Sequence, residues 1–176
     1  MFRPGSLQRD YSLFSEYDEA FDLPQIPQVT DDSTDEDREA SKAIAAERAS
    51  KIRIARETGD WKPILRPGGK PVEFVCRQLP GTVLDWWHDY KAGEMARRTM
   101  LLRLSLKAIK NLDFPDDIVV FESEDGHRKL STAALDYLYS FGTEDHPQLG
   151  RSVVGEIAIQ VAERTFRGLV PLSRGG

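Results

Sequence analysis

The side chains that could carry out chemistry in this 176-residue chain are few and far apart. The three histidines, His88, His127 and His146, lack the spacing of a metal-binding motif. An acidic group could attract a cation, but it lacks the alternating oxygens, the glycine and the distal glutamate of a calcium-binding loop. Its members are Asp116, Asp117, Glu122, Glu124 and Asp125. The sequence therefore predicts no metal site and no cofactor.

A nucleophile or a phosphate-binding loop is not evident in the sequence either. Cys76, the single cysteine, alternates with Val72 and Phe74 in a run of strand-forming residues, which predicts a buried and unreactive thiol. The segment Gly68-Gly69-Lys70 has the composition of a phosphate loop but not its spacing. The chain also lacks the nucleophile-elbow, zinc-protease and dinucleotide-binding motifs. We therefore predict that the protein has no enzymatic activity.

Aromatic side chains that a small core cannot fully absorb are the best functional candidates. Four lie in an acidic N-terminal segment, and two adjacent tryptophans lie on a short predicted helix, where they point about 100° apart. An interface needs a few large side chains of this kind near its centre. The predicted partner-binding residues are Tyr11, Phe14, Tyr17, Phe21, Trp86 and Trp87. For the first four, a disordered tail with incidental aromatic residues is the alternative.

Charge is unevenly divided along the chain, whose formal net charge is −5. Residues 1–40 carry 11 acidic and 3 basic residues, residues 41–110 carry 7 and 15, and residues 111–176 carry 11 and 6. An acidic head followed by a basic middle indicates self-association or the masking of a basic surface. A solvated tail and an ordinary mixed surface are the alternative. Because the sequence has neither an apolar run of membrane-spanning length nor a signal-peptide core, we expect a cytoplasmic protein with no membrane partner.

The chain is expected to form four regions. Residues 1–37 are predicted to be an extended acidic arm that adds little to the core, because their composition cannot bury enough apolar area to offset the ordering entropy. Residues 38–59 are predicted to form a basic surface helix. The remaining regions are a small α+β domain at residues 60–168 and a flexible C-terminus at residues 169–176.

The surface helix has a thin apolar stripe. Its alanine-rich pattern extends over residues 35–58, with Asp35 as the predicted cap and Gly59 as the stop. Since few large apolar residues other than Ile44 and Ile52 line it, the helix should lie on the surface or pack on another chain. A basic helix can bind nucleic acid, but no aromatic interleaving or nucleic-acid motif accompanies this one. A DNA-binding regulator is therefore the weakest of the functions considered.

Strand and helix patterns alternate between residues 60 and 168. A hairpin is predicted from residues 64–66 and 72–76 around a Pro-Gly-Gly turn, and a second strand pair from 118–121 and 127–130 around an Asp-Gly turn. Helices are predicted over residues 94–112, from a cap at Ser131 to a stop before Gly142, and over 152–167. We therefore predict an α+β fold in which three or four helices pack on a small antiparallel sheet.

From residue 72 onward this layout resembles small phage proteins known as tail assembly chaperones. The matching segments are residues 74–81, which end in Leu-Pro-Gly, the 101–112 helix, Asp125-Gly126 with Leu130-Ser131-Thr132, and the closing helix at 153–166. Proteins of that family coat the hydrophobic tape-measure protein before the tail tube polymerises, and they have no catalytic residues. The resemblance thus implies a protein that binds a long helical partner in the host cytoplasm during assembly.

Two classes of function follow. The first is an assembly chaperone whose partner is a tape-measure or tail-tube protein. The second is a structural virion protein (a head, connector or tail accessory subunit) whose N-terminal arm docks on a neighbouring subunit. An ordered arm would favour the second, and self-association is compatible with both. Presence in the purified particle distinguishes them, because a chaperone leaves before maturation and a structural subunit stays.

Overall fold

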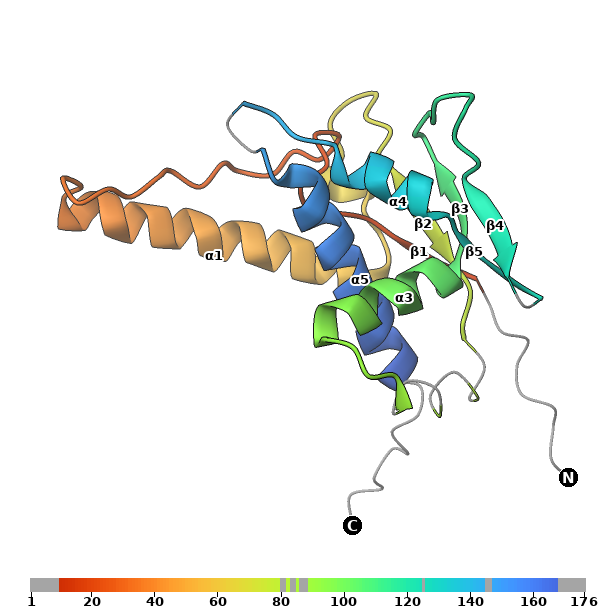
Figure 1. Cartoon of the computed structure of the whole chain (residues 1–176). Coiled ribbons are helices and arrows are strands. Elements are labelled where there is room, and N and C mark those ends of the chain that lie inside the picture. Colours follow the sequence, from red (N-terminus) through yellow and green to blue (C-terminus); the bar gives the residue numbers. More distant parts are fainter. Residues whose placement is uncertain are drawn as a thin grey trace, which may run out of the picture. The chain divides into compact units, whose positions relative to one another are not determined.

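The computed structural model describes residues 10–79, 82, 85, 89–124, 126–144 and 147–167 (Figure 1). The chain divides into two compact units, which we treat separately. Unit 1 comprises residues 1–17 and 72–176, and unit 2 comprises residues 18–71. Within the described residues the α-helices occur together with two small antiparallel sheets, so the predicted α+β fold is confirmed.

Unit 1 contains both sheets. Strands β1 (Tyr11–Leu13), β2 (Glu73–Cys76) and β3 (Leu106–Lys110) pair in the order β1-β2-β3, all antiparallel. Strands β4 (Phe121–Glu124) and β5 (His127–Leu130) form a separate hairpin. The alternation predicted for β2 is present, because Phe74 and Cys76 are buried while Glu73 and Val75 are half-buried.

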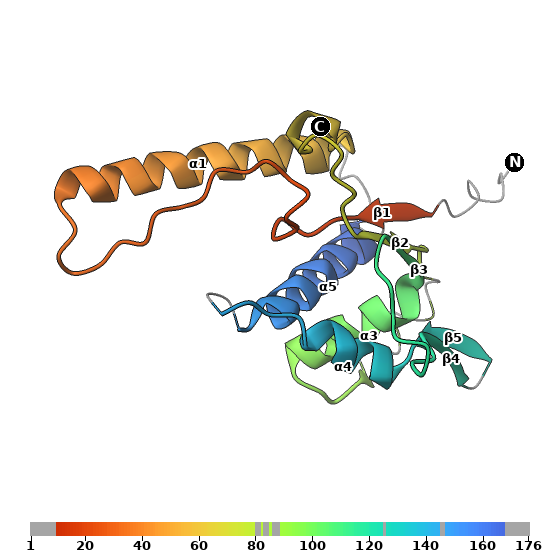
Figure 2. The same cartoon turned by 90° about the horizontal axis from the view of Figure 1, so that it is seen from above.

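Three helices of unit 1 lie within the residues that the structure describes. They are α3 (Glu94–Ser105), α4 (Thr132–Tyr139) and α5 (Leu149–Arg167), and both α3 and α4 pack on α5 (Figure 2). Ser131 caps α4 as predicted, since its hydroxyl accepts a hydrogen bond from the Ala134 N–H at 3.0 Å. The predicted stripe of α5 is buried, including Val154, Ile157 and Val161. It packs with residues of α3 and β2 into one core.

Unit 2 is built on the long helix α1 (Asp35–Thr58) and the short 3₁₀ helix η1 (Lys62–Ile64). Its core lies at the C-terminal end of α1, where Ile52 and Ala55 are buried. The Phe21 and Trp61 rings lie 5.0 Å apart at their centroids. Phe21 also forms an isolated antiparallel bridge with Leu65, which holds the two ends of the unit together.

The C-terminal end of α1 lies where the sequence predicts it, whereas its N-terminal cap is a different residue from the predicted one. Gly59 ends the helix in a left-handed conformation, with φ of 70°, as its lack of a side chain allows. The N-terminal cap is Thr34, not the expected Asp35. The Thr34 hydroxyl accepts from the Asp37 N–H at 3.1 Å, and the Asp37 carboxylate accepts from the Thr34 N–H at 2.9 Å. This reciprocal capping box satisfies two backbone groups that a lone Asp35 cap would leave open.

The structure corrects the prediction of an extended arm outside the core. Residues Tyr11–Leu13 form an edge strand, and Leu13, only 6% exposed, is part of the core of unit 1. Further along, Phe21 and Leu23 are buried in unit 2. The local sequence does not indicate this strand, because its composition is acidic and the strand that pairs with β1 lies about sixty residues later in the chain.

Three predicted elements differ in their bounds or pairing. The predicted helix at 94–112 ends at Ser105 and continues as β3, which gives β2 a partner on its second edge. The predicted hairpin of 64–66 with 72–76 does not form, because β2 pairs with β1 and β3 while Leu65 pairs with Phe21. The strand predicted at 118–121 begins at Phe121. In the first two cases long-range pairing overrides the local pattern.

Candidate functional site

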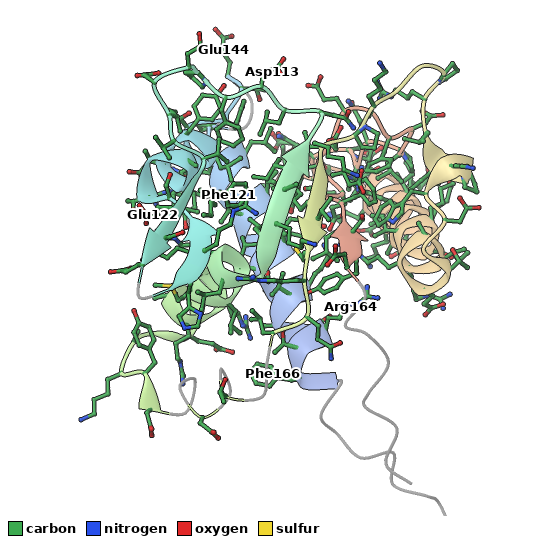
Figure 3. All side chains as sticks on the ribbon, turned by 90° about the vertical axis from the view of Figure 1, so that its right-hand side faces the viewer. Asp113, Phe121, Glu122, Glu144, Arg164 and Phe166 are labelled. Atoms are coloured by element: carbon green, nitrogen blue, oxygen red, sulfur yellow. The ribbon has the colours of Figure 1, made fainter. Side chains whose placement is uncertain are left out.

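The six predicted partner-binding residues do not form one site. Trp86 and Trp87 lie outside the described residues. Tyr11 packs against the core of unit 1, with the Arg164 guanidinium 4.3 Å from its ring centroid, and burial raises the pKa of its hydroxyl. Figure 3 shows Arg164 close to the three-stranded sheet of unit 1. The Tyr11 ring is thus engaged by its own unit and is only partly exposed.

The other three predicted residues of the arm differ in how much of their side chain is exposed. Phe21 is only 2% exposed and stacks on Trp61, so its assignment as a partner-binding residue is wrong. Phe14 is half-buried, and Tyr17 is exposed. Of the four aromatic residues predicted in the arm, Tyr17 retains the most surface for a partner.

Hydrogen bonds to α5 fix the segment that follows β1. The Glu156 carboxylate accepts from the Ser15 hydroxyl at 2.6 Å and from the Glu16 N–H at 3.1 and 3.2 Å. Gln160 donates its side-chain amide to the Phe14 carbonyl oxygen at 3.3 Å. Residues 14–16 are therefore fastened to their own unit and do not form a free docking arm.

A surface groove in unit 1 is a stronger candidate site. It lies between α3, α4 and the start of α5 and has a volume of about 640 Å³. We call it the α3–α5 groove. Its apolar and aromatic lining consists of Tyr90, Met95, Met100, Leu135 and Tyr139. Methionine and tyrosine side chains suit a contact surface, because thioethers adapt their shape and tyrosine combines an apolar ring with a polar tip.

Local sequence features create this groove. Gly155 lies where α5 passes α3, and a Cβ atom there would be 3.6 Å from the Met95 Cε. The missing side chain therefore leaves room at the floor of the groove. Met95 itself is 48% exposed, which is unusual for a large apolar side chain next to a packed core.

Two arginines give the groove positive charge. Arg103 is held in place by three contacts: its Nε donates to the Leu130 carbonyl at 2.8 Å, and its Nη2 lies 3.2 Å from both Glu122 and Thr132. Figure 3 shows Glu122 on β4 beside Phe121. Arg151, in the first turn of α5, is exposed. None of the described residues that line the groove is acidic.

The titratable groups singled out in the sequence lie in a buried core position, in ion pairs or on the surface. Burial raises the pKa of the Cys76 thiol to about 12, and Cys76 is fully buried. Glu122 and Glu124 both contact Lys129 on the paired strand. His127 is exposed on β5, while His88 and His146 lie outside the described residues. Within the described part of the chain, no group of three His, Cys, Asp or Glu residues could hold a metal ion.

Helix α1 is less basic at its surface than its sequence indicates. Lys42 pairs with Glu39 at 2.7 Å, and Lys51 pairs with Glu47 at 2.8 Å. The Arg48 Nη1 donates to the Pro24 carbonyl at 3.2 Å. Because neighbouring groups of the same unit take up these charges, α1 offers little positive field to a nucleic acid.

Sequence reasoning missed the α3–α5 groove. Met95, Met100 and Tyr139 attracted no attention, because single apolar residues on a helix normally belong to the core. One signal was available: Gly155 lies inside the closing helix, where glycine is unfavourable for helix formation and calls for another reason.

The comparisons with known proteins give no match. No family model matches the chain, and neither the curated proteins nor the solved structures include a significant match to it. Among the described helices, none combines the length and apolar character needed to cross a membrane. The function must therefore be argued from the residues and their geometry.

Proposed function

We propose that this protein is a non-enzymatic phage morphogenesis protein, a tail assembly chaperone that binds the tape-measure protein. The α3–α5 groove is the observation that supports the proposal best. It gathers Met95, Met100 and two tyrosines around one hollow of the surface, as expected of a site that holds an apolar segment of a partner. The layout from residue 72 onward, which resembles tail assembly chaperones, supports the same function.

The shape and chemistry of the groove suit one face of a helix. An amphipathic helix lays apolar residues at positions i, i+3, i+4 and i+7 into a groove between helices. Met95 and Met100 can adjust to such side chains, while Arg103 and Arg151 offer donors at the edge of the contact. A tape-measure protein is long, helical and hydrophobic, so it supplies many segments of this kind.

A binding experiment with a matched control tests the proposal. The tape-measure protein of the same phage is co-expressed with wild-type protein, with Met95→Glu, and with Val119→Glu. Val119 is 70% exposed in unit 1 and does not line the groove. Val119→Glu therefore replaces an exposed apolar residue by glutamate, as Met95→Glu does, but outside the groove. We expect Met95→Glu to lower the affinity about 30-fold, which is the effect of losing about 2 kcal/mol at an interface centre. Val119→Glu should bind as wild type does.

The outcome of this experiment can contradict the proposal in two ways. If Met95→Glu stays folded and binds the tape-measure protein normally, the groove is not the client site. If neither wild type nor variant binds it, the chaperone function is wrong. Trp86→Ala and Trp87→Ala belong in the same series, because these tryptophans remain predicted partner-binding residues.

A structural virion subunit is the second candidate function, and the form of unit 2 favours it. In that unit, α1 extends well beyond the small core around Phe21 and Trp61. A projecting helix of this kind suits contact with a neighbouring subunit. Mass spectrometry of purified particles separates the two functions, since a chaperone would be absent from them and present only in the host cytoplasm during assembly.

A further inference from the structure

The α3–α5 groove needs an occupant whose chemistry fits both its apolar floor and its arginines. Exposed methionine surface is costly in water, and an uncovered groove would favour non-specific association. The described lining residues include two arginines and no carboxylate. Arg103 already pairs with Glu122 at 3.2 Å, so the positive charge offered to an occupant comes from the exposed Arg151. The occupant should therefore combine apolar side chains with negative charge.

Unit 2 carries a surface with this chemistry. We call residues 26–40 the acidic tip; it contains six acidic residues and one basic residue, Arg38. All six acidic side chains are exposed, and so are the apolar side chains of Ile26 and Val29, at 47% and 44%. The acidic residues are Asp31, Asp32, Asp35, Glu36, Asp37 and Glu39.

The acidic tip is ordered by its own hydrogen bonds. The Arg38 guanidinium donates to the carbonyl oxygens of Thr30 and Ser33, both at 3.3 Å. The capping box of Thr34 and Asp37 fixes the start of the helix. The one positive charge of the tip is thus directed toward its own backbone, and the negative charges remain on the outside.

The acidic tip lies far from the core of its own unit. Along α1, Asp35 is 17 residues from the buried Ile52, which corresponds to about 26 Å at 1.5 Å per residue. Most side chains of the first three turns of α1 are exposed, with Ser41 the buried one. A rigid, projecting, acidic and partly apolar surface has the properties of a docking element.

We propose that the acidic tip of one copy of this chain occupies the α3–α5 groove of a second copy. Ile26 and Val29 would contact the methionines, and the carboxylates would face the exposed Arg151. The interface joins two different surfaces, so a pair of copies keeps one free tip and one free groove, and the assembly can grow or close into a ring. The inference rests on the proposed function only in that both use the groove, so the tape-measure protein and the second copy compete for it.

Sedimentation equilibrium of the purified full-length chain at low salt tests this assembly without any phage partner. Wild type should associate with rising concentration, and added salt should weaken the association because it screens exposed charges. The tip variant Asp31→Asn/Asp32→Asn/Glu36→Gln and the groove variant Met95→Glu/Arg151→Glu should each weaken self-association at least tenfold. A 1:1 mixture of the two variants should form dimers, because it restores one intact tip and one intact groove.

A second triple variant, Glu19→Gln/Asp22→Asn/Asp60→Asn, is the matched control. It removes the same charge from unit 2 outside the acidic tip, and it should associate like wild type. The inference is overturned if wild type is monomeric throughout, if the control weakens association as much as the tip variant, or if the mixed variants stay monomeric. Each of these results leaves the binding experiment with the tape-measure protein intact, so the two proposals fail independently.

Discussion

Leu13→Ala should destabilise unit 1 strongly, although Leu13 lies in a segment whose composition is that of a disordered tail. Leu13 faces Phe74 across the β1–β2 pair and is 6% exposed within the core. Truncation to alanine removes three buried carbon groups, worth about 0.8 kcal/mol each, and leaves a cavity. The expected loss is about 3 kcal/mol, within the range found for buried leucines. For a chain of this size it lowers Tm by about 6–12 °C.

Urea unfolding followed by circular dichroism measures this loss, with Ser12→Ala as the control. Ser12 lies on the opposite face of the same strand, is exposed, and donates to Glu73 at 2.5 Å. Its replacement should cost less than about 1 kcal/mol. Hydrogen exchange adds a local readout, because Leu13→Ala should speed exchange in β2, the strand that pairs with β1. If Leu13→Ala unfolds within about 0.5 kcal/mol of wild type, as surface substitutions do, then β1 is not part of the core and the reasoning is wrong.

Three further predictions concern single contacts. Thr34→Ala should cost about 1 kcal/mol of unit 2 stability by urea unfolding. Because Thr34 lowers the pKa of Asp37, the Asp37 contribution is present at neutral pH and is lost as pH falls below 3.8, so wild type and Asp37→Asn should converge in stability in acid. Cys76 should resist thiol reagents at pH 7 until the protein unfolds, since raising its pKa from 9.0 to about 12 lowers the thiolate population about a thousandfold. Phe21→Ala should cost about 3–5 kcal/mol and shift the fluorescence emission of its neighbour Trp61, and an unchanged stability would contradict the packing of this pair.

Features set by neighbouring residues were predictable from the sequence. Gly59 and Ser131 mark helix ends through their own backbone or hydroxyl chemistry, and both do so in the structure. The stripe of α5 repeats at helical spacing, so its buried face follows from periodicity alone. The α+β class could be predicted because it depends on these local signals.

Features set by distant residues were not predictable from the sequence. Residues 106–110 follow a helical pattern and have good helix formers, yet they form β3 because β2 has an open edge that they can pair with. Residues 11–13 form β1 for the same reason, in spite of the acidic segment around them. No local propensity encodes such pairing, since the partner strands are contributed by other parts of the chain.

The placement of β1 also changes which surfaces can bind a partner. A free arm would have brought Tyr11 and Phe14 to a neighbour, but hydrogen bonds from residues 14–16 to Glu156 and Gln160 hold this segment on α5. Releasing it would break the β1–β2 pairing and expose Leu13, at a cost of several kcal/mol by the argument above. The surfaces that need no rearrangement of the fold are those already exposed: Met95 in the α3–α5 groove, and Ile26 with Val29 at the acidic tip. A protein that acts by contact should therefore use these surfaces before its N-terminal strand.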